Sequence, residues 1–481
     1  MIKSDLEIKD LIVGNLQKLP FIEAAAEIAG QRNEKAFVVG GYIRDLILGA
    51  GKQDIDILVV GDGTAFAEDL GRKLGVKDII VYGNFGTANF KYGDFDLEFV
   101  GARKESYKPE SRNPEVVPST FEDDISRRDF TINSIAVSIN KDSFGEISDL
   151  YNGIGDIFAG VLKTPLEPDT TFDDDPLRIM RAIRFAARFG FTIDAEVFEA
   201  MKRKAARLEI VSQERVKDEF IKILGGERPG DGLRLMYESG VMKIVFPEVD
   251  KLGGVDQINE YHHKDVFYHT CLVVDNISKV TDDVWLRFAA LVHDIAKPQT
   301  KRFVEGTGWT FHGHEELGAR MMRGIFQRMK FPFAKINYIK KLVRLHLRPV
   351  ALSNDSVTDS AIRRLIVEAG DDLDDLITLC RADITSKNEY KVKTILANYD
   401  RVMQRVLEVR EKDALRAFQS PVRGEEIMEV LKLKPGREVG IVKKAIEEAI
   451  LEGIIPNEYD AAYKYMLDEA ANLLNPGIKS A

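Results

Sequence analysis

Short β-type runs are concentrated between residue 36 and about residue 165, and the sequence from Leu177 onward shows helical spacing instead. The early runs include AFVVGG, DIDILVV, FDLEFV and INSIAVSI, which are separated by glycines and polar clusters, as strands usually are. One helical segment, near 64–75, interrupts them. The chain is therefore predicted to fold as an α+β domain built on a sheet, followed by domains made only of helices.

The length and the breaks in periodicity predict several domains. At roughly 150 residues per domain, 481 residues suggest about three. The helical periodicity is interrupted at 250–264 and at 386–395, which are therefore the expected domain boundaries in the helical part. The expected division is an N-terminal helical segment at 1–35, a head at 36–165, a helical neck and body at 166–255, a second helical domain at 256–390 and a helical tail at 391–481.

Composition excludes several classes of protein. With 44% hydrophobic and 30% charged residues, the chain is expected to be folded and soluble. No apolar run approaches the roughly 18 residues that span a bilayer, and MIKSDLEIKD has acids where a signal peptide has basic and apolar residues. Two cysteines, Cys271 and Cys380, fit packing thiols in a reducing, cytoplasmic location. A net charge of −10 argues against indiscriminate nucleic-acid coating, although the basic segments 201–208 and 340–348 are candidates for RNA contact.

A glycine turn precedes a short helix in FVVGGYIRDLIL. Gly40 and Gly41 end a β-type run, and Arg44 and Asp45 fall at the start of the predicted helix. Glycines let the backbone approach a phosphate closely, and the helix N-terminus and an arginine supply hydrogen-bond donors. The segment therefore suits an anion.

A pair of carboxylates follows this turn in DIDILVV. Asp54 and Asp56 alternate with isoleucines, so on a strand both carboxylates point to one face. Two like charges so close need a cation, and oxygen ligands favour Mg²⁺, which would orient phosphoryl or nucleotidyl transfer. Glu98 in FDLEFV is the best-placed third acid. The simpler alternative is a strand with a polar outer face.

An arginine stripe follows an acidic cap in DDDPLRIMRAIRFAARF. Pro176 suits the first turn of a helix and makes Asp175 its expected N-cap. At 100° per residue, one side of this helix carries Arg178, Arg181, Arg184 and Arg188. A solvated face is the usual meaning of such a stripe, but an Asp and an Arg three residues apart can also offer an acceptor and donors to the edge of a base.

Histidines are few and clustered. There are seven in the chain, and His293 with Asp294 lies in the apolar run LRFAALVHDIAKP, where a carboxylate beside an imidazole suggests metal ligation. Five of the seven are His269, His293, His312, His314 and His346. His262, His263 and His312 are interpreted as ordinary histidines.

The order of these motifs resembles a known family. GGYIRD with DID, then RRDFTINSIAV, DDDPLRIMRAIRFAARFGF and SQERVKDEFIKIL, is similar to the motifs of class II tRNA nucleotidyltransferases (the CCA-adding enzymes) and bacterial poly(A) polymerases, over roughly residues 36–250. These belong to the polymerase beta-like nucleotidyltransferase superfamily, which implies a head with a mixed sheet and catalytic metals on Asp54 and Asp56. The resemblance implies that Gly41 and Arg44 meet the nucleotide phosphates. It implies nucleotide binding for Gly40, Gly41, Arg44, Asp45, Arg127, Arg128, Asp129 and Asn133.

The arginine stripe resembles the EDxxR motif of the class II enzymes. By that resemblance Asp175 and Arg178 form an amino-acid template that selects C and then A, with Arg181 and Arg184 near the triphosphate. This chain has Asp174 where the motif has Glu.

His269, the pair His293–Asp294, His314, His346 and Asp383 together resemble the ligand set of the HD superfamily of metal-dependent phosphohydrolases. GHEELGAR and CRADITSKN are similar to the HD module of some CCA-adding enzymes, so the resemblance implies that His269, His293, Asp294, His314, His346 and Asp383 are metal ligands. Six ligands would suit two metals, and imidazole donors suit ions such as Ni²⁺ or Mn²⁺.

The function expected is therefore addition or repair of the 3′-terminal CCA of tRNA from CTP and ATP with release of pyrophosphate, and no membrane partner. The alternatives within the family are a poly(A) polymerase and a CC-only or A-only enzyme. From other classes, the alternatives are mainly an HD phosphohydrolase acting on phosphate monoesters or 2′,3′-cyclic phosphates, and a non-catalytic RNA-binding protein.

Overall fold

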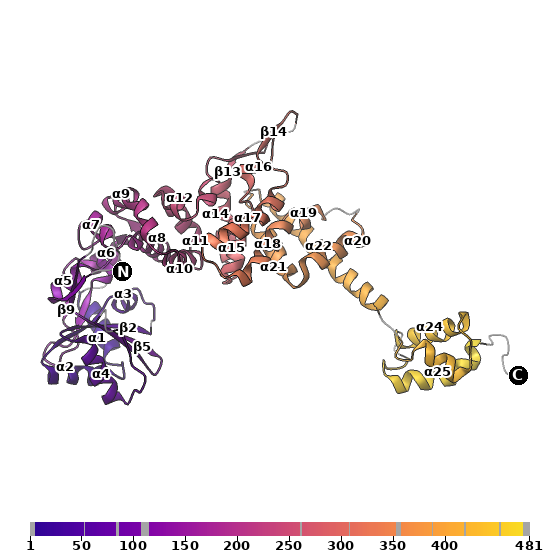
Figure 1. Ribbon diagram of the computed structural model, residues 1–481, viewed down its shortest axis with the longest axis horizontal. Helices are drawn as coiled ribbons and strands as arrows, with labels where there is room; N and C mark the ends of the chain where they lie inside the picture. The colour runs from indigo at the N-terminus through magenta and orange to yellow at the C-terminus, as the bar shows by residue number, and fades with distance from the viewer. Residues whose placement is uncertain are drawn as a thin grey trace. The chain divides into compact units, whose positions relative to one another are not determined.

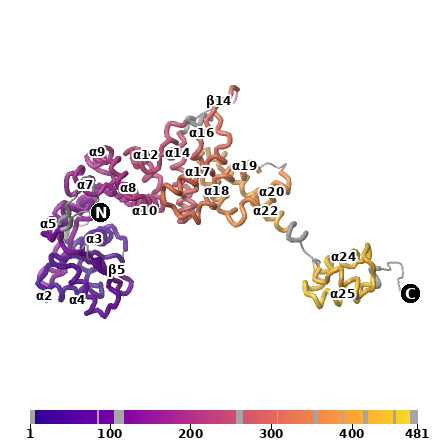
Figure 2. Tube along the Cα trace, viewed as in Figure 1, coloured from indigo at the N-terminus to yellow at the C-terminus, as the bar shows by residue number. Residues whose placement is uncertain are grey.

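The computed structural model describes residues 5–51, 53–82, 86–106, 115–259, 262–306, 308–352, 357–386, 388–417, 420–451 and 454–474. The chain divides into two compact units, one of Met1–Pro349 with Ala369–Ile395 and one of Val350–Glu368 with Leu396–Ala481. Figures 1 and 2 follow the chain by colour, from indigo at the N-terminus to yellow at the C-terminus. Among the described helices, none is both long and apolar enough to cross a membrane.

The head is built on a sheet of seven strands. These are β1 (Lys35–Val39), β2 (Asp54–Val60), β3 (Ile80–Tyr82), β4 (Thr87–Tyr92), β5 (Phe95–Gly101), β8 (Ala136–Ser138) and β9 (Ile147–Ser148). Their order is β3-β4-β5-β2-β1-β8-β9. β2 and β5 are parallel, and the other neighbours are antiparallel, which confirms the predicted mixed sheet. A separate antiparallel pair is formed by β6 (Arg103–Ser106) and β7 (Glu115–Pro118).

Five helices belong to the head: α1 (Asp5–Leu16), α2 (Ile22–Arg32), α3 (Gly41–Ile47), α4 (Gly63–Leu74) and α5 (Phe121–Ser126). α4 lies at the predicted segment. It begins after Asp62, whose carboxylate accepts hydrogen bonds from the N–H groups of Thr64 and Ala65 at 3.0 Å each. It ends at Gly75, whose φ of 73° glycine adopts without strain. α2 and α4 lie side by side, with α4 against β4 and β5 (Figure 1).

Eight helices form the neck and body: α6 (Gly153–Ala159), α7 (Pro168–Asp174), α8 (Leu177–Phe189), α9 (Ala195–Lys204), α10 (Gln213–Leu224), α11 (Pro229–Glu238), α12 (Val241–Val245) and α13 (Pro247–Asp250). α8 packs against α10 and α11. On its apolar side Ile179, Met180 and Ile183 are fully buried. The helical period therefore leaves the arginine stripe on the other side, as predicted.

The next helices of the first unit are α14 (Val266–Ser278), α15 (Val284–Val292), α16 (Lys297–Thr300), α17 (His314–Arg328), α18 (Ile336–Leu345) and α21 (Leu373–Ala382). They share an aromatic core with the body. Phe246 lies 5.9 Å from Phe220 of α10 and 6.1 Å from Phe288 of α15, measured between ring centroids. Phe331 continues the cluster at 5.0 Å from Phe288. This shared core fixes α10 and α15 relative to each other.

The second unit is helical. It contains most of α20 (Asp359–Ala369), together with α23 (Gly424–Leu431), α24 (Arg437–Leu451) and α25 (Tyr459–Leu474). α19 (Arg348–Ala351) and the long helix α22 (Glu389–Ala417) run from one unit into the other. The core of the second unit is formed by Val422, Ile427, Val442, Ile446, Ala462 and Met466.

Strands beyond the head are a difference from the sequence prediction. Val161–Leu162 (β10) pairs in parallel with Thr192–Ile193 (β11). Two antiparallel pairs follow: β12 (Asp256–Asn259) with β13 (His262–Asp265), and β14 (Arg302–Val304) with β15 (Gly308–Thr310). Strands of two to four residues are too short to show a period of two, so their pattern was invisible in a helical context.

Candidate functional site

The predicted catalytic carboxylates, Asp54 and Asp56, lie at the start of the central strand of the head. Ile55 and Ile57 of β2 are fully buried, so the period of two places Asp54 and Asp56 on the opposite face. In the parallel register of β2 with β5, Asp56 lies beside Glu98. The pKa of Glu98 is raised, because its carboxyl group is partly desolvated and because the negative charge of Asp56 faces it.

These three acids fit a Mg²⁺ site. All their donors are oxygens, which this ion prefers. The raised pKa of Glu98 shows that negative charge accumulates beside Asp56, and a divalent cation would relieve that repulsion. The third acid that the sequence suggested is thus in place next to the pair.

Gly40 joins β1 to α3 at this site. Its φ of 75° and ψ of −131° lie in a region that L side chains rarely adopt. A Cβ at this position would lie 3.1 Å from Nη1 of Arg128 and 3.3 Å from Oδ2 of Asp56. The absence of a side chain at Gly40 therefore lets a catalytic carboxylate and an arginine approach the same turn.

Arg44 lies in a buried network. Its guanidinium is 2% exposed and donates through Nε to Asp45 at 2.8 Å and through Nη1 to Asn133. Asn133 in turn donates to Asp129 at 2.9 Å, and Arg181 contacts the other oxygen of Asp129 at 2.6 Å. Burial opposes ionisation of Asp129, but Arg181 and Asn133 hold its pKa below the usual value. Phosphate contact by Arg44 stays a prediction, and it requires these bonds to rearrange.

Arg127 and Arg128 share one buried carboxylate. Asp124, which is fully buried, accepts from Nη2 of Arg127 at 2.6 Å and from Nη2 of Arg128 at 3.2 Å. The sequence analysis missed Asp124. The available signal was its spacing of three and four residues from the two arginines at the end of a helix.

The start of α8 places the expected template pair against the head. Asp175 accepts from the N–H of Leu177 at 3.1 Å, but α8 begins at Leu177 with Pro176 as its N-cap, so the expected N-cap position was one residue too early. Arg178 is 9% exposed and donates to the carbonyl oxygens of Arg127 at 2.6 Å and Thr171 at 3.3 Å. Two N–H groups of Arg178, one on each terminal nitrogen, are therefore bound to main chain in this structure.

Two residues of α10 form ion pairs with this region, one with Asp175 and one with the arginine stripe. Arg215 donates to the second oxygen of the Asp175 carboxylate at 2.8 Å. Glu219, which is 4% exposed, accepts from Arg184 at 2.6 Å. Both pairs span 35 residues or more, so no local pattern in the sequence could indicate them.

The histidine cluster is separate from the acids of the head. Its six side chains form two groups of three, and within each group the candidate ligand atoms lie within 4.8 Å of one another. One group is His269, His293 and Asp383, and the other is Asp294, His314 and His346. Asp294 connects the groups, with its Oδ2 3.2 Å from Nε2 of His293 and its Oδ1 3.2 Å from Nε2 of His314.

The second nitrogen of each histidine has a fixed partner. Three Nδ1 atoms lie against carbonyl oxygens three residues earlier: His293 on Ala290 at 2.8 Å, His314 on Phe311 at 2.7 Å and His346 on Val343 at 2.7 Å. The fourth, His269, contacts the hydroxyl of Thr385 at 2.9 Å. A carbonyl oxygen can only accept, so in His293, His314 and His346 Nδ1 carries a proton and Nε2 faces the cluster.

The Nε2 atoms and carboxylates fit a bound cation. Nε2 of His293 is buried without a well-formed hydrogen bond, and Nε2 of His314 and His346 lie only 3.3 Å apart. Burial lowers the pKa of His293, but Asp294 and Asp383 outweigh it and raise the value to about 10. Burial and the neighbouring His293 lower the pKa of His346 to about 4. The carboxylates of the cluster therefore stabilise a positive charge on His293, and a divalent ion bound there would supply such a charge instead.

The histidines and cysteines without an expected ligand role lie outside the cluster or behind it. His312 is exposed, and the side chains of His262 and His263 lie outside the described residues. Cys271 and Cys380 are buried thiols, and burial raises the pKa of both. Cys380 donates to the carbonyl oxygen of His346 at 3.0 Å, so it packs behind the cluster.

Comparison with known proteins matches the order of these parts. Residues 36–163 match the "Poly A polymerase head domain", residues 190–252 the "Probable RNA and SrmB- binding site of polymerase A" and residues 266–387 the "HD domain". Among solved structures, an apo form of a CCA-adding enzyme aligns with a TM-score of 0.61 at 22% identity, covering 99% of both chains. The Thermotoga maritima CCA-adding enzyme in complex with tRNA gives 0.59 at 21%, covering 95% of this chain and 98% of that one. These structures share the fold.

Curated relatives are more similar in sequence. A CC-adding tRNA nucleotidyltransferase of Thermus thermophilus is 31% identical over 89% of this chain and 92% of its own. An A-adding tRNA nucleotidyltransferase of Deinococcus radiodurans is 30% identical over 89% and 94%. A multifunctional CCA protein of Nitrosospira multiformis is 33% identical over 66% and 77%. The chain therefore belongs to the tRNA nucleotidyltransferase family that carries a poly(A) polymerase head domain and, here, an HD domain.

Proposed function

We propose that this enzyme adds CMP and AMP from CTP and ATP to the 3′ end of tRNA, completing or repairing the terminal CCA. The observation that carries the proposal is the placement of the Asp175–Arg178 pair against the same head that holds Asp54, Asp56 and Glu98. Ordered addition without a nucleic-acid template needs side chains that select the base, and it also needs acids that hold the metal at the phosphates. The relatives named after tRNA nucleotide addition support the choice of substrate.

The reaction requires attack of the tRNA 3′-hydroxyl on the α-phosphorus of the nucleotide. The bond from that phosphorus to the bridging oxygen of the β-phosphate breaks, and pyrophosphate leaves with its electron pair. Asp54 and Asp56, with Glu98 beside them, would hold Mg²⁺, which neutralises charge on the phosphates and lowers the pKa of the hydroxyl when bound. Asp175 and Arg178 would orient the base, and Arg181 keeps Asp129 ionised at the junction.

The relatives divide on which nucleotides are added, since one is named CC-adding, one A-adding and one a CCA protein. The test uses three tRNAs, lacking CCA, CA or A, each given CTP or ATP alone, followed by sequencing of the 3′ ends. We expect CTP to extend the first two and ATP only the third. Failure of ATP to extend the tRNA that lacks A would assign a CC-only activity, and failure of CTP to extend the other two would assign an A-only activity. Repeated addition of A to any RNA end would assign a poly(A) polymerase.

We propose a second activity at the histidine cluster, namely hydrolysis of phosphate monoesters or 2′,3′-cyclic phosphates. The buried Nε2 atoms that face Asp294 and Asp383 support it, because they would hold one or two divalent transition ions such as Ni²⁺ or Mn²⁺. Such an ion supplies Lewis acidity and an activated water when bound. Lys297 lies 2.6 Å from Asp294 and holds that carboxylate in place.

A single variant tests whether the two activities are separate. Asp294→Ala should eliminate hydrolysis of 2′,3′-cyclic AMP in the presence of Mn²⁺ or Ni²⁺, while CMP addition persists. Nucleotidyl transfer uses ligands more than two hundred residues earlier in the sequence, in the head. A thermal melt controls for folding, since loss of a ligand in a buried metal site can destabilise its helices. Loss of both activities in a well-folded variant would contradict the separation.

We infer a cytoplasmic enzyme, in keeping with its two free, buried thiols.

A further inference from the structure

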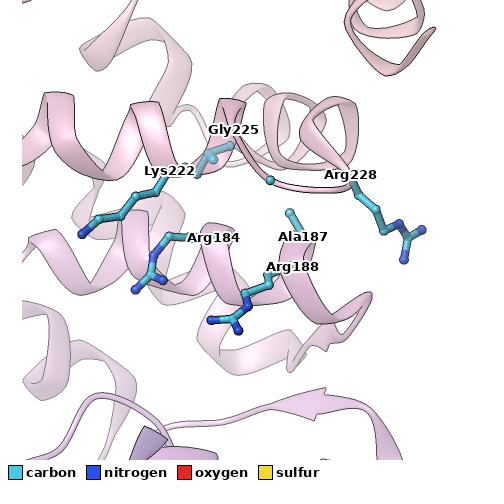
Figure 3. A pocket seen from close by; sticks show the side chains of 8 residues that line it. Arg184, Ala187, Arg188, Lys222, Gly225 and Arg228 are labelled. Atoms are coloured by element: carbon cyan, nitrogen blue, oxygen red, sulfur yellow. The ribbon is translucent and has the colours of Figure 1, made fainter. Parts of the chain in front are cut away.

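A basic pocket lies between α8 and α10, and one of its arginines, Arg188, contacts Asp45 of the head at 3.6 Å. It encloses about 330 Å³. Its lining consists of Arg184, Ala187, Arg188, Lys222, Ile223, Gly225, Gly226 and Arg228. No acid is among these lining residues. Figure 3 shows Arg184 and Arg188 on one helix, with Lys222 and Arg228 on either side of Gly225.

The positive charge of the pocket is only partly neutralised. Glu219 serves two cations at once, contacting Arg184 at 2.6 Å and Lys222 at 3.3 Å. Arg228 contacts Asp231 through Nη2 at 2.7 Å, which leaves further N–H donors of its planar fork. The side chains of Lys222 and Arg228 are 57% and 54% exposed, so solvent and ligands reach them.

The pocket is built by packing contacts. Gly190, at the end of α8 with φ +67°, lies directly under Arg228, and a Cβ there would overlap Nη1 of that arginine. Arg287 of α15 is 2% exposed and donates through Nη1 to the carbonyl oxygens of Leu224 at 3.2 Å and Gly226 at 2.7 Å. These bonds fix the turn that follows α10, so glycine backbone rather than side chains faces the pocket at Gly225 and Gly226.

We propose that this pocket binds a backbone phosphate of the RNA primer, upstream of its reacting 3′ end. A guanidinium fork and an ammonium group over glycine backbone are complementary to a phosphodiester. Such interactions carry no sequence information, which suits an enzyme that acts on many tRNAs. Lys222 and Arg228 also fall within the part of the chain that matches a probable RNA-binding region.

The other phosphate source is the nucleotide triphosphate, and its geometry fits less well. Arg184 and Arg188 lie six and ten residues beyond Arg178, about 9 and 15 Å along the helix axis. A nucleotide whose base meets Arg178 must place its phosphates at Asp54 and Asp56 in the head. Arg188 contacts Asp45 of the head at 3.6 Å, so the preference for RNA is carried by the exposed Lys222 and Arg228, whose acidic partners lie on α10 and α11. This preference rests on the proposed function, because it takes those assignments as given.

The test compares binding and catalysis in one double variant. Lys222→Gln with Arg228→Gln should raise the Kd for tRNA lacking CCA about tenfold at low salt, measured without nucleotide. The slope of log Kd against log salt should fall by about 0.7 for each phosphate that the variant no longer neutralises. The KM for CTP and kcat at saturating tRNA should stay at the wild-type values. Lys217→Gln, on the same helix and outside the pocket lining, is the matched control and should bind tRNA normally.

Further variants keep the outcome decisive. Lys222→Arg with Arg228→Lys preserves the charge and should restore the salt slope, whereas damage to folding would not be rescued. An unchanged Kd for tRNA overturns the proposal, and a raised KM for CTP with normal tRNA binding assigns the pocket to the triphosphate instead. Binding is measured without nucleotide, so the two proposals can fail separately. A wild-type protein that binds tRNA through the pocket but adds no nucleotide would refute the proposed function and still support this inference.

Discussion

Replacing Gly40 by alanine should damage both stability and catalysis, and the two effects can be separated. At φ 75° and ψ −131° an alanine costs about 1–3 kcal/mol of backbone strain. Its Cβ would also lie 3.1 Å from Nη1 of Arg128 and 3.3 Å from Oδ2 of Asp56, which is tighter than most Cβ contacts. One of these groups must therefore shift by a few tenths of an ångström. Because small displacements of reacting groups are costly, kcat for CMP addition should fall roughly 10- to 100-fold.

Gly49 provides the matched control for Gly40. Its φ is also 75°, but a Cβ there would meet no atom within 4 Å. Gly49→Ala should therefore lower the melting temperature through strain alone and leave kcat unchanged. The assay is a thermal melt of each variant, followed by kcat at saturating Mg²⁺, CTP and tRNA. If Gly40→Ala lowered the melting temperature only as much as Gly49→Ala and kept wild-type kcat, the Asp56 carboxylate would not need the open turn at Gly40.

Other variants test the remaining assignments. Asp54→Ala or Asp56→Ala should abolish CMP and AMP addition while tRNA binding stays nearly normal, and incorporation retained in both variants at the wild-type rate and Mg²⁺ requirement would refute the metal role. Glu98→Gln should lower kcat and raise the Mg²⁺ concentration needed for half-maximal rate, whereas an unchanged Mg²⁺ response would remove it from the site. Arg178→Ala should reduce discrimination among nucleotides about 10- to 100-fold, and an equal loss of affinity for all four nucleotides would move it to the phosphates.

Local pattern predicted the parts of the site that depend on one element. Alternation in DIDILVV placed Asp54 and Asp56 on one face, because a strand has a fixed period of two. The helical period separated the arginine stripe from Ile179 and Ile183 in the same way. Glu98 was selected only as an acid on a nearby strand, and it was the parallel register of β2 with β5 that put it beside Asp56.

Charge partners depend on tertiary structure, so counting charges along the sequence does not find them. The basic segment 201–208 was a candidate for RNA contact, yet two of its cations are neutralised by α7. Lys204 contacts Asp173 at 2.7 Å, and Arg207 contacts the same carboxylate at 3.2 Å. The basic pocket takes Arg188 and Lys222 from helices far apart in the sequence. A run of like charge indicates a solvated face, whereas a phosphate site needs cations that converge in space.

The hydrogen bonds of Arg178 have a consequence for nucleotide selection. One N–H of each terminal nitrogen contacts a carbonyl oxygen, of Thr171 and of Arg127, so under the proposed function a base that uses these two donors must replace main-chain acceptors. A base with well-placed acceptors would match those bonds, but one without them would leave buried donors unpaired. We therefore expect the competing carbonyls to penalise the wrong nucleotides most. The contact between Arg181 and Asp129, at 2.6 Å, holds α8 on the head independently of Arg178. Arg178 can therefore exchange a carbonyl oxygen for a base while α8 stays in place.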